Sequence, residues 1–250
     1  MHTAQAEPAF LPALTDNARA TVLNRMFDGL SAKDMLSEAL NGDLKGRVAL
    51  VSSFGAESIA LLYLVAEIDR ATPVIFLETG MLFPETLTYQ QDIAAQLGLT
   101  DLRVIRPDPG ALSGFDPDGT LHKRNTDACC RLRKTLPLEK ALAPFEGWIT
   151  GRKRYQSTER ADLPKFEYDS NGRLKLNPLA DWGPQDVRDY VKSANLPPHP
   201  LVAKGYPSIG CAPCTSSVAK GEDPRAGRWR GEAKSECGIH FVNGKLVRGS

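Results

Sequence analysis

The stretch VALVSSFGAESIALLYLVAEI, residues 48–68, decides the fold. Its first part, Val48–Ser52, is short and mostly apolar, which predicts a buried strand. A loop over Ser53–Glu57 follows, and apolar residues then recur at helical spacing over Ser58–Ile68. A strand, a loop and a helix in this order form the first half of a βαβ unit.

The same order repeats on the C-terminal side of this stretch. Pro73–Leu77 is a predicted strand, Pro84–Leu97 a helix that begins with proline, and Leu102–Ile105 a third strand. Trp148–Thr150 is the predicted fourth strand. Strands that alternate with helices predict an α/β fold, with a mainly parallel sheet flanked by helices on both faces.

Local signals predict most of the other elements. Residues 106–126 lack periodicity and hold several Pro, Gly and Asp, which predicts a long functional loop. Asp127–Leu142 and Gln185–Ala194 are predicted helices. Asn171-Gly172 predicts a hairpin turn between two short strands, Phe166–Tyr168 and Leu174–Leu176.

The chain divides into three predicted parts. Residues 1–45 form an N-terminal segment with two short helices, in which Ser31 and Asp34 resemble a capping box. Residues 46–218 form the main domain, and residues 219–250 form a C-terminal tail rich in Gly, Cys and Arg.

Composition and charge exclude several classes of protein. The formal net charge is +1, so no overall field favours nucleic acid or a membrane surface as a partner. The chain has no run of about 18 apolar residues, and residues 1–14 lack the pattern of a signal peptide. A cytoplasmic location is therefore expected, where the five cysteines stay reduced and serve as ligands or reactive groups.

Four of the cysteines fall into two pairs. Cys129 and Cys130 are adjacent, and Cys211 and Cys214 form a Cys-x-x-Cys motif. Four thiolates can hold a zinc ion or a [4Fe–4S] cluster. Adjacent side chains diverge, so they suit the separate iron corners of a cluster better than a single ion. A turn with buried thiols is the alternative for the Cys-x-x-Cys pair alone.

Cations lie close to the first pair and in two further segments. Arg131, Arg133 and Lys134 can offset a cluster's negative charge, bind an anion, or form a solvated helix face. The loop at 52–58 is either a phosphate site at a helix N-terminus or a plain turn. The four cations of residues 150–160 favour binding of a phosphate or sulfate anion.

The fifth cysteine lies in the tail. Cys237 follows Arg225, Arg228 and Arg230, and cations can lower the pKa of a thiol and make it nucleophilic. Glu236 opposes this effect. Position alone leaves open whether Cys237 is reactive or inert.

Together these segments resemble the assimilatory sulfonucleotide (APS/PAPS) reductases. Residues 53–57 resemble the modified pyrophosphate loop of that family, and residues 150–160 resemble its arginine loop. Residues 77–80 resemble its Leu-Asp-Thr-Gly motif, with Glu78 in place of Asp. Residues 234–240, KSECGIH, match its terminal Glu-Cys-Gly-Leu-His motif with Ile for Leu.

The resemblance implies an adenine nucleotide α-hydrolase-like (Rossmann-like) fold and a mechanism. Cys237 attacks the terminal sulfur of adenylyl sulfate (APS), AMP leaves, and an S-sulfocysteine forms. Thioredoxin or a similar dithiol then releases sulfite. The residues implied to bind the substrate are Ser53, Phe54, Gly55, Ala56, Glu57, Thr79, Lys134, Arg152, Arg160, Arg225, Arg228 and His240.

The family has two branches, and the cysteine pairs distinguish them. One branch keeps only the terminal cysteine and uses the 3′-phosphorylated substrate PAPS. The other has both pairs, binds a [4Fe–4S] cluster and mostly uses APS. This chain resembles the second branch, which implies a cluster held by Cys129, Cys130, Cys211 and Cys214. Dual use of APS and PAPS and assembly into a homo-oligomer stay open.

Two rival hypotheses are weaker. An ATP-pyrophosphatase-type tRNA thiolase has a Ser-Gly-Gly-x-Asp-Ser loop, whereas this chain has Glu57 at the position of the Asp, and Phe54 and Ala56 interrupt the glycines. A non-catalytic zinc or iron–sulfur module gives no account of Cys237 within its motif.

Overall fold

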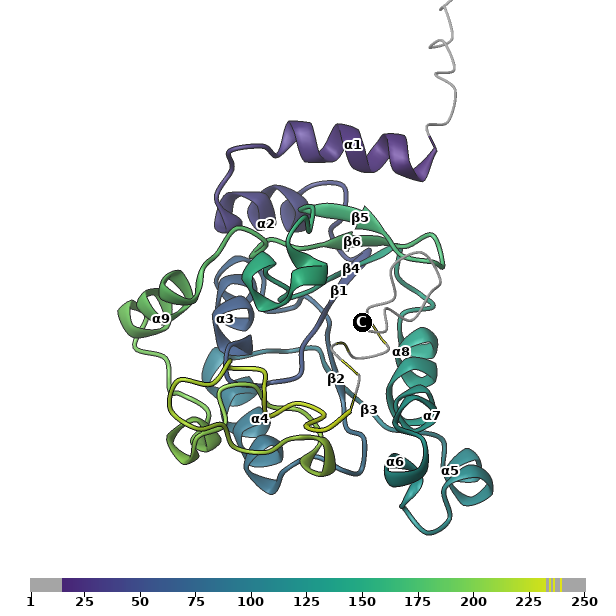
Figure 1. The fold of residues 1–250 in the computed structure, drawn as a ribbon. Coiled ribbons are helices and arrows are strands. Elements are labelled where there is room, and N and C mark those ends of the chain that lie inside the picture. Colours follow the sequence, from purple (N-terminus) through teal and green to yellow (C-terminus); the bar gives the residue numbers. More distant parts are fainter. Residues whose placement is uncertain (1–14, 233, 235, 237–238, 240–250) are drawn as a thin grey trace, which may run out of the picture.

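The computed structural model describes residues 15–232, 234, 236 and 239. Its centre is a six-stranded sheet of order β3-β2-β1-β4-β6-β5 (Figure 1). The strands are β1 Val48–Val51, β2 Val74–Leu77, β3 Leu102–Ile105, β4 Gly147–Ile149, β5 Phe166–Tyr168 and β6 Leu174–Leu176. The helices flanking them are α1 Asp16–Met26, α2 Ala32–Asn41, α3 Ser58–Ile68, α4 Pro84–Leu97, α5 Pro109–Phe115, α6 Leu121–Arg124, α7 Thr126–Cys130, α8 Leu136–Ala141 and α9 Pro184–Ser193.

The sheet is parallel except at one edge. All neighbouring strands pair in parallel apart from β5, which runs antiparallel to β6. The hairpin between them turns at Asn171 and Gly172, and Gly172 has a φ of +72°, which glycine adopts without strain. The mainly parallel sheet and the hairpin confirm the sequence-based prediction.

Helix α1 covers the edge strand of the sheet. Asn24 accepts a hydrogen bond from the Phe166 amide at 3.0 Å and donates one to the Phe166 carbonyl at 2.7 Å. The side chain thus pairs with β5 as a further strand would. Unpaired backbone groups on an edge strand can pair with another chain, and Asn24 occupies both backbone groups of Phe166 on this edge.

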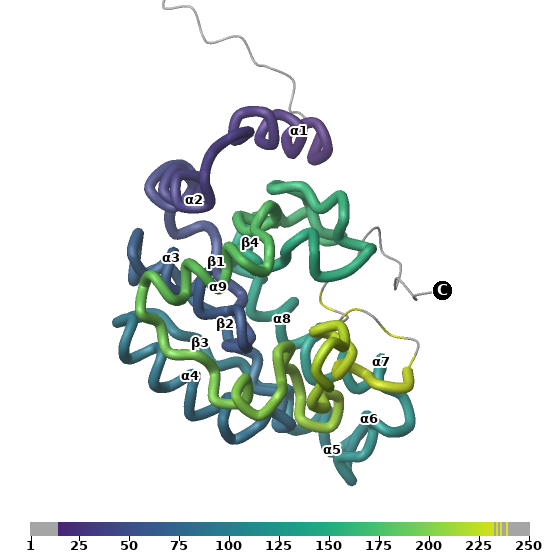
Figure 2. The backbone as a smooth tube through the Cα atoms, turned by 60° about the vertical axis from the view of Figure 1, so that its left-hand side comes forward, coloured from purple at the N-terminus to yellow at the C-terminus, as the bar shows by residue number. Residues whose placement is uncertain are grey.

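Alternate residues of the strands pack on opposite faces. Val48, Leu50 and Phe76 belong to one buried cluster with α2, α3 and α4, whereas Ala49 and Ile75 pack against α8 on the other face. Figures 1 and 2 show α3, α4 and α9 on one side of the sheet and α7 and α8 on the other. Apolar residues on both faces are the mark of a parallel sheet covered on both sides.

Two predictions for residues 106–142 are wrong in detail. The segment 106–126 is not a continuous loop, because it contains α5 and α6. The single helix expected over Asp127–Leu142 is divided into α7, a π-helical turn at Arg131–Thr135, and α8. Pro137 gives the physical reason, because it cannot donate to the Arg133 carbonyl and its ring would collide with that carbonyl in a regular α-helix.

The topology places several loops at one edge of the sheet. Strands β1, β2 and β4 are neighbours and parallel, so the loops that follow them start from the same edge. In open α/β sheets this carboxyl edge is where ligands bind. Among the described residues, the structure contains no helix with the length and apolarity that a membrane crossing requires.

Candidate active site

The loop after β1 is held in an unusual backbone conformation. Phe54 has a φ of +49°, a region that bulky residues seldom adopt. Its ring is fully buried and packs edge-on against Phe76, with centroids 5.4 Å apart. The Ser58 hydroxyl accepts a hydrogen bond from the Gly55 amide at 3.1 Å. Burial of the Phe54 ring leaves backbone groups and the exposed Ser53 hydroxyl as the parts of this loop that a ligand can reach.

Glu57 joins this loop to the arginine loop. Its carboxylate accepts hydrogen bonds from Lys153 Nζ and Gln156 Nε2, both at 2.9 Å, and from the Tyr155 hydroxyl. Partial burial opposes ionisation, but the Lys153 charge and these hydrogen bonds outweigh it and lower the pKa of Glu57. The carboxylate is therefore occupied in anchoring the arginine loop.

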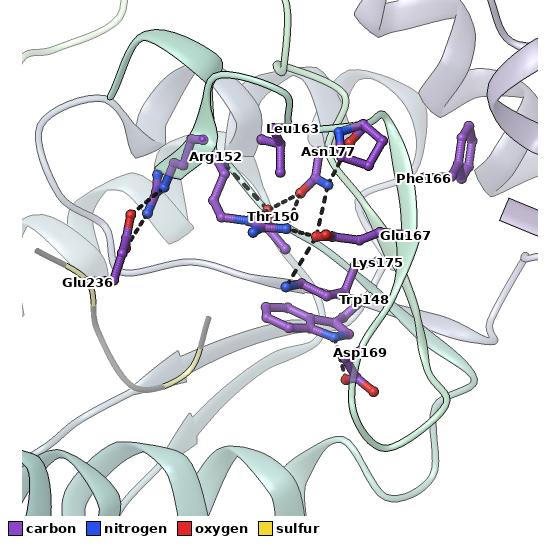
Figure 3. A network of polar contacts seen from close by, with 12 residues as sticks. Trp148, Thr150, Arg152, Leu163, Phe166, Glu167, Asp169, Lys175, Asn177 and Glu236 are labelled. Carbon is purple, nitrogen blue, oxygen red and sulfur yellow. Dashed lines mark hydrogen bonds and ion pairs between the residues drawn. The ribbon is translucent and has the colours of Figure 1, made fainter. Parts of the chain in front are cut away.

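Arg152 is buried in a polar network at the carboxyl end of β4 (Figure 3). Its guanidinium donates to the Glu167 carboxylate, and to Asn177 Oδ1 at 3.1 Å. Lys175 Nζ lies 3.2 Å from the same carboxylate and 5.0 Å from the centroid of the Trp148 ring. Burial, with the nearby Arg152 charge, lowers the pKa of Lys175 to about 6.

Arg160 connects the arginine loop to the tail. Its Nε and Nη2 donate to the two oxygens of Glu236 at 2.6 and 2.7 Å, and both side chains are largely buried. Arg225 Nη2 lies 3.8 Å from the same carboxylate, and the Ser157 hydroxyl lies 3.4 Å from it. The residue that precedes Cys237 in the sequence is thus bound to the arginine loop.

Within the described part of the chain, no disulfide links the four paired cysteines. Cys211 Sγ lies 3.3 Å from the Thr79 hydroxyl, so the Cys-x-x-Cys segment meets the loop after β2. The pKa of Cys129 is raised to about 11, chiefly by burial; the Arg133 charge opposes this rise, and Cys211 and Cys214 contribute to it. The two pairs are therefore within electrostatic reach of each other, as one shared site requires.

The chemistry of these four thiols fits a metal cluster. No three His, Cys, Asp or Glu side chains in the described ranges converge closely enough to bind one metal ion. The donor set is thiols only, as a [4Fe–4S] cluster requires. Arg228 Nε and Trp229 Nε1 are buried without a hydrogen-bond partner in the described part of the chain. Cys129, Cys130, Cys211 and Cys214 are the residues that could hold such a group.

The cations after the first cysteine pair do not share one role. Arg133 is buried and donates to Asp116 at 2.6 Å and to the Thr79 carbonyl at 2.9 Å. It therefore stabilises the fold and is committed to protein groups. Lys134 is half-buried, and its charge lowers the pKa of Cys214, although burial raises that pKa overall. Both cations act on the thiols, because the Arg133 charge lowers the pKa of Cys129 and the Lys134 charge lowers that of Cys214.

Arg228 reaches the Cys-x-x-Cys segment because Gly210 lacks a side chain. A Cβ at position 210 would collide with Arg228 Nη2. The guanidinium stacks on the Trp229 ring, 4.4 Å from its centroid. A cation held this way lies next to the Cys211–Cys214 turn and contributes, with Lys134, to lowering the pKa of Cys214.

The structure gathers most of the predicted site residues and adds others. Glu57, Arg152, Arg160 and Arg225 meet around the arginine loop, and Thr79 meets Cys211. Cys237 and His240 lie outside the described residues. The sequence analysis did not single out Lys153, Glu167, Lys175, Asn177 and Lys234 as site residues. A lysine between two leucines in β6 was the one available signal for Lys175.

Comparison with solved structures confirms the fold class. The phosphoadenylyl-sulfate reductase of Candida auris, solved as a phosphate complex, superposes with a TM-score of 0.70 at 25% identity over 82% of this chain and 98% of that chain. Yeast FAD synthetase superposes with a TM-score of 0.52 at 15% identity over 79% of this chain and 74% of that chain. The sheet, its helices and these likenesses define an adenine nucleotide α-hydrolase-like fold.

Sequence comparison then defines the family. The model of the phosphoadenosine phosphosulfate reductase domain matches residues 47–217, and the chain belongs to this family of enzymes. The adenosine 5′-phosphosulfate reductase of Mesorhizobium japonicum is 49% identical over 90% of this chain and 88% of its own. The phosphoadenosine 5′-phosphosulfate reductase of Gloeobacter violaceus is 42% identical over 87% of this chain and 92% of its own.

Proposed function

We propose that this protein reduces adenylyl sulfate to sulfite and AMP in sulfate assimilation, with thioredoxin or a similar dithiol as the electron donor. The observation that carries the proposal is the contact between Glu236 and Arg160, because it brings the residue next to Cys237 to the arginine loop. Relatives named adenosine 5′-phosphosulfate reductase, at 49% and 46% identity, support APS as the substrate.

Cys237 is the proposed nucleophile. Its thiolate attacks the terminal sulfur of APS, a bond forms between Sγ and that sulfur, and the bond from sulfur to the bridging oxygen breaks. AMP leaves with the electron pair, and Cys237 carries the sulfo group. A donor thiolate then attacks Sγ, and sulfite leaves with the electron pair of the broken S–S bond. The second donor thiol resolves the mixed disulfide, so the donor is oxidised and Cys237 is restored.

The charge of the substrate is balanced by cations that converge on the carboxyl edge. Arg152, Arg160 and Arg225 are largely buried there, and they share the carboxylates Glu167 and Glu236. This surplus of positive charge favours a phosphosulfate anion. Lys134 and Arg228 add charge from the thiol segments, and Thr79 and the backbone of residues 53–57 complete the proposed substrate site, with His240 from the tail.

Cys129, Cys130, Cys211 and Cys214 are the proposed ligands of a [4Fe–4S] cluster. When bound, such a cluster supplies a fixed charge next to the substrate site. Lys134 and Arg228 act on these thiols and also border the substrate site, so they connect the two. A cytoplasmic location agrees with this proposal, because reduced thiols are needed both as ligands and as the nucleophile.

Dual use of APS and PAPS is the second candidate. It is favoured by the Gloeobacter violaceus relative, which is 42% identical and is named for the phosphorylated substrate. An ATP-pyrophosphatase activity is disfavoured, because Glu57 is engaged by Lys153, Tyr155 and Gln156. A non-catalytic zinc module is disfavoured because it gives no account of Cys237 within its motif.

Sulfite release from APS and from PAPS, measured side by side with thioredoxin, tests the proposal. We expect APS to be used far more efficiently than PAPS. Equal efficiency would establish the dual-specificity candidate. A preference for PAPS, or no sulfite from either nucleotide, would contradict the proposed function.

A further inference from the structure

Two ion pairs bind the segment that precedes Cys237. Lys234 Nζ lies 2.6 Å from Asp127 Oδ1 on α7, and the Lys234 side chain is 9% exposed. Its ammonium also lies 3.5 Å from Cys130 Sγ and 5.5 Å from the centroid of the Trp229 ring. Lys234 therefore ties the tail to the helix that carries the adjacent cysteines.

The second pair lies on the arginine loop. Glu236 receives two parallel hydrogen bonds from Arg160, and the two side chains are 13% and 8% exposed. A bidentate carboxylate–guanidinium pair fixes orientation as well as distance. Glu236 is thus held more rigidly than a single surface contact would hold it.

The two pairs have opposite polarity, and this specifies how the segment lies. The cation of the tail meets an acid of α7, and the acid of the tail meets a cation of the arginine loop. Reversing the segment would place Lys234 near Arg160 and Glu236 near Asp127. Like charges in partly buried positions repel, so the reversed arrangement is disfavoured.

Neither carboxylate suits an anionic substrate. Asp127 and Glu236 would repel a phosphosulfate group, so their contacts with Lys234 and Arg160 serve the protein itself. We propose that Lys234 and Glu236 are positioning residues that dock the tail between α7 and the arginine loop and thereby place Cys237. This inference rests on the proposed role of Cys237 as nucleophile. It assigns Arg160 to tail docking, whereas the sequence analysis predicted substrate binding.

The test measures the reactivity of Cys237 in the full-length, iron-loaded protein. Lys234→Met and Glu236→Gln each remove one pair and keep the approximate side-chain size. Their matched controls are Lys220→Met, an exposed lysine, and Glu222→Gln, which pairs with Arg230 away from the docking contacts. The tryptic peptide that contains Cys237 has no other cysteine, so alkylation by iodoacetamide can be quantified there by mass spectrometry.

Docking predicts the same direction of change in both variants. The plateau rate of alkylation at high pH should rise about tenfold in each, which corresponds to a docking equilibrium weakened by ~1.4 kcal/mol. Removal of the Glu236 carboxylate lowers the pKa of the Cys237 thiol, whereas removal of the Lys234 ammonium raises it. A rise of the plateau alkylation rate in both variants therefore reports the accessibility of Cys237. The kcat for sulfite formation should fall, while AMP affinity and iron content stay at the wild-type level.

A charge exchange sharpens the test. Asp127→Lys combined with Lys234→Glu restores an ion pair of reversed polarity, and the alkylation rate should return toward that of the wild type. Plateau rates in Lys234→Met and Glu236→Gln that match their controls would overturn the inference. Failure of the proposed function has a different signature: the wild type would form no sulfite, while the alkylation differences would persist.

Discussion

The two sides of the candidate site differ in how their polar groups are satisfied. The arginine side is defined by the buried cations Arg152, Lys153, Arg160 and Lys175 and the carboxylates they contact. There, each cation pairs with a carboxylate from another segment of the chain, as in Lys153 with Glu57, Arg152 with Glu167 and Arg160 with Glu236. On the thiol side, defined by the four paired cysteines and Arg228, no disulfide links these thiols within the described residues. There, Arg228 Nε lacks a hydrogen-bond partner among the described residues.

This difference indicates what holds each side together. The arginine side is preorganised by the protein's own ion pairs, so a substitution there should change the affinity for an anion. The thiol side presents four thiols that no disulfide links within the described residues, so a substitution there should cost a group that these thiols bind.

The proposed nucleophile, Cys237, is not among the residues that define either side, so its removal should leave both sides intact. Cys237→Ser should lower the rate of sulfite formation by at least about 10³-fold, because a serine hydroxyl is not ionised near neutral pH. The variant should keep its iron and its affinity for AMP. Incubation of wild-type protein with APS, without thioredoxin, should add one sulfo group to the peptide that holds Cys237. An adduct on another cysteine would contradict the mechanism.

A matched substitution on the thiol side should have the opposite signature. Cys211→Ser should reduce iron from about four atoms per chain in anaerobic protein to well below one, since a cubane needs four ligands. Iron analysis and the brown colour measure this directly, and Cys237→Ser is the control. AMP binding should survive in part, because the cations of the arginine side do not contact Cys211. Stoichiometric zinc with negligible iron in the wild type would instead show a zinc site.

A smaller effect is expected on the arginine side. Arg152→Ala should weaken binding of APS by about 1.5–3 kcal/mol, the worth of charge-assisted hydrogen bonds. Arg154→Ala is the control, because Arg154 lies in the same loop but is 43% exposed and pairs with Asp181. Calorimetric titration of both variants should separate them. Equal affinities would place the anion away from Arg152.

The sequence predicted the fold well because strand and helix periodicities are local. The strands from β1 to β6 and the helices α3, α4 and α9 lie within a residue or so of their predicted bounds. The π-helical turn at Arg131–Thr135 was missed, since it depends on how Pro137 disturbs one carbonyl in a segment whose composition favours a regular helix.

The site was predictable in its residue types but not in its pairings. The cations of residues 150–160 were found from their density, yet their partners Glu57, Glu167 and Glu236 come from three separate segments. Such pairings depend on tertiary structure, which a single sequence does not give. Arg133 illustrates the limit, because its position beside the cysteines does not reveal its hydrogen bonds with Asp116 and Thr79.

The pH dependence of the free energy of unfolding reports the charge state of Lys175 on the arginine side. The pKa of Lys175 is lowered to about 6 in the folded state, below its value of 10.5 in the unfolded chain. Between these values the unfolded state binds more protons, so stability should rise with pH, by at most about 1.4 kcal/mol per pH unit. Below about pH 6 the lysine is charged in both states, and this contribution to the slope vanishes.

Lys175→Met removes the titrating group and keeps an unbranched apolar stem over the Trp148 ring. Urea unfolding of the wild type and the variant at several pH values from about 6 to 9 should therefore show a shallower rise in the variant. Lys165→Met is the control, because Lys165 lies nearby in the sequence and pairs with Asp181 at 3.6 Å, not with Glu167. Identical slopes in all three proteins would mean that Lys175 stays protonated beside Glu167. The arginine side would then hold one more positive charge for the substrate.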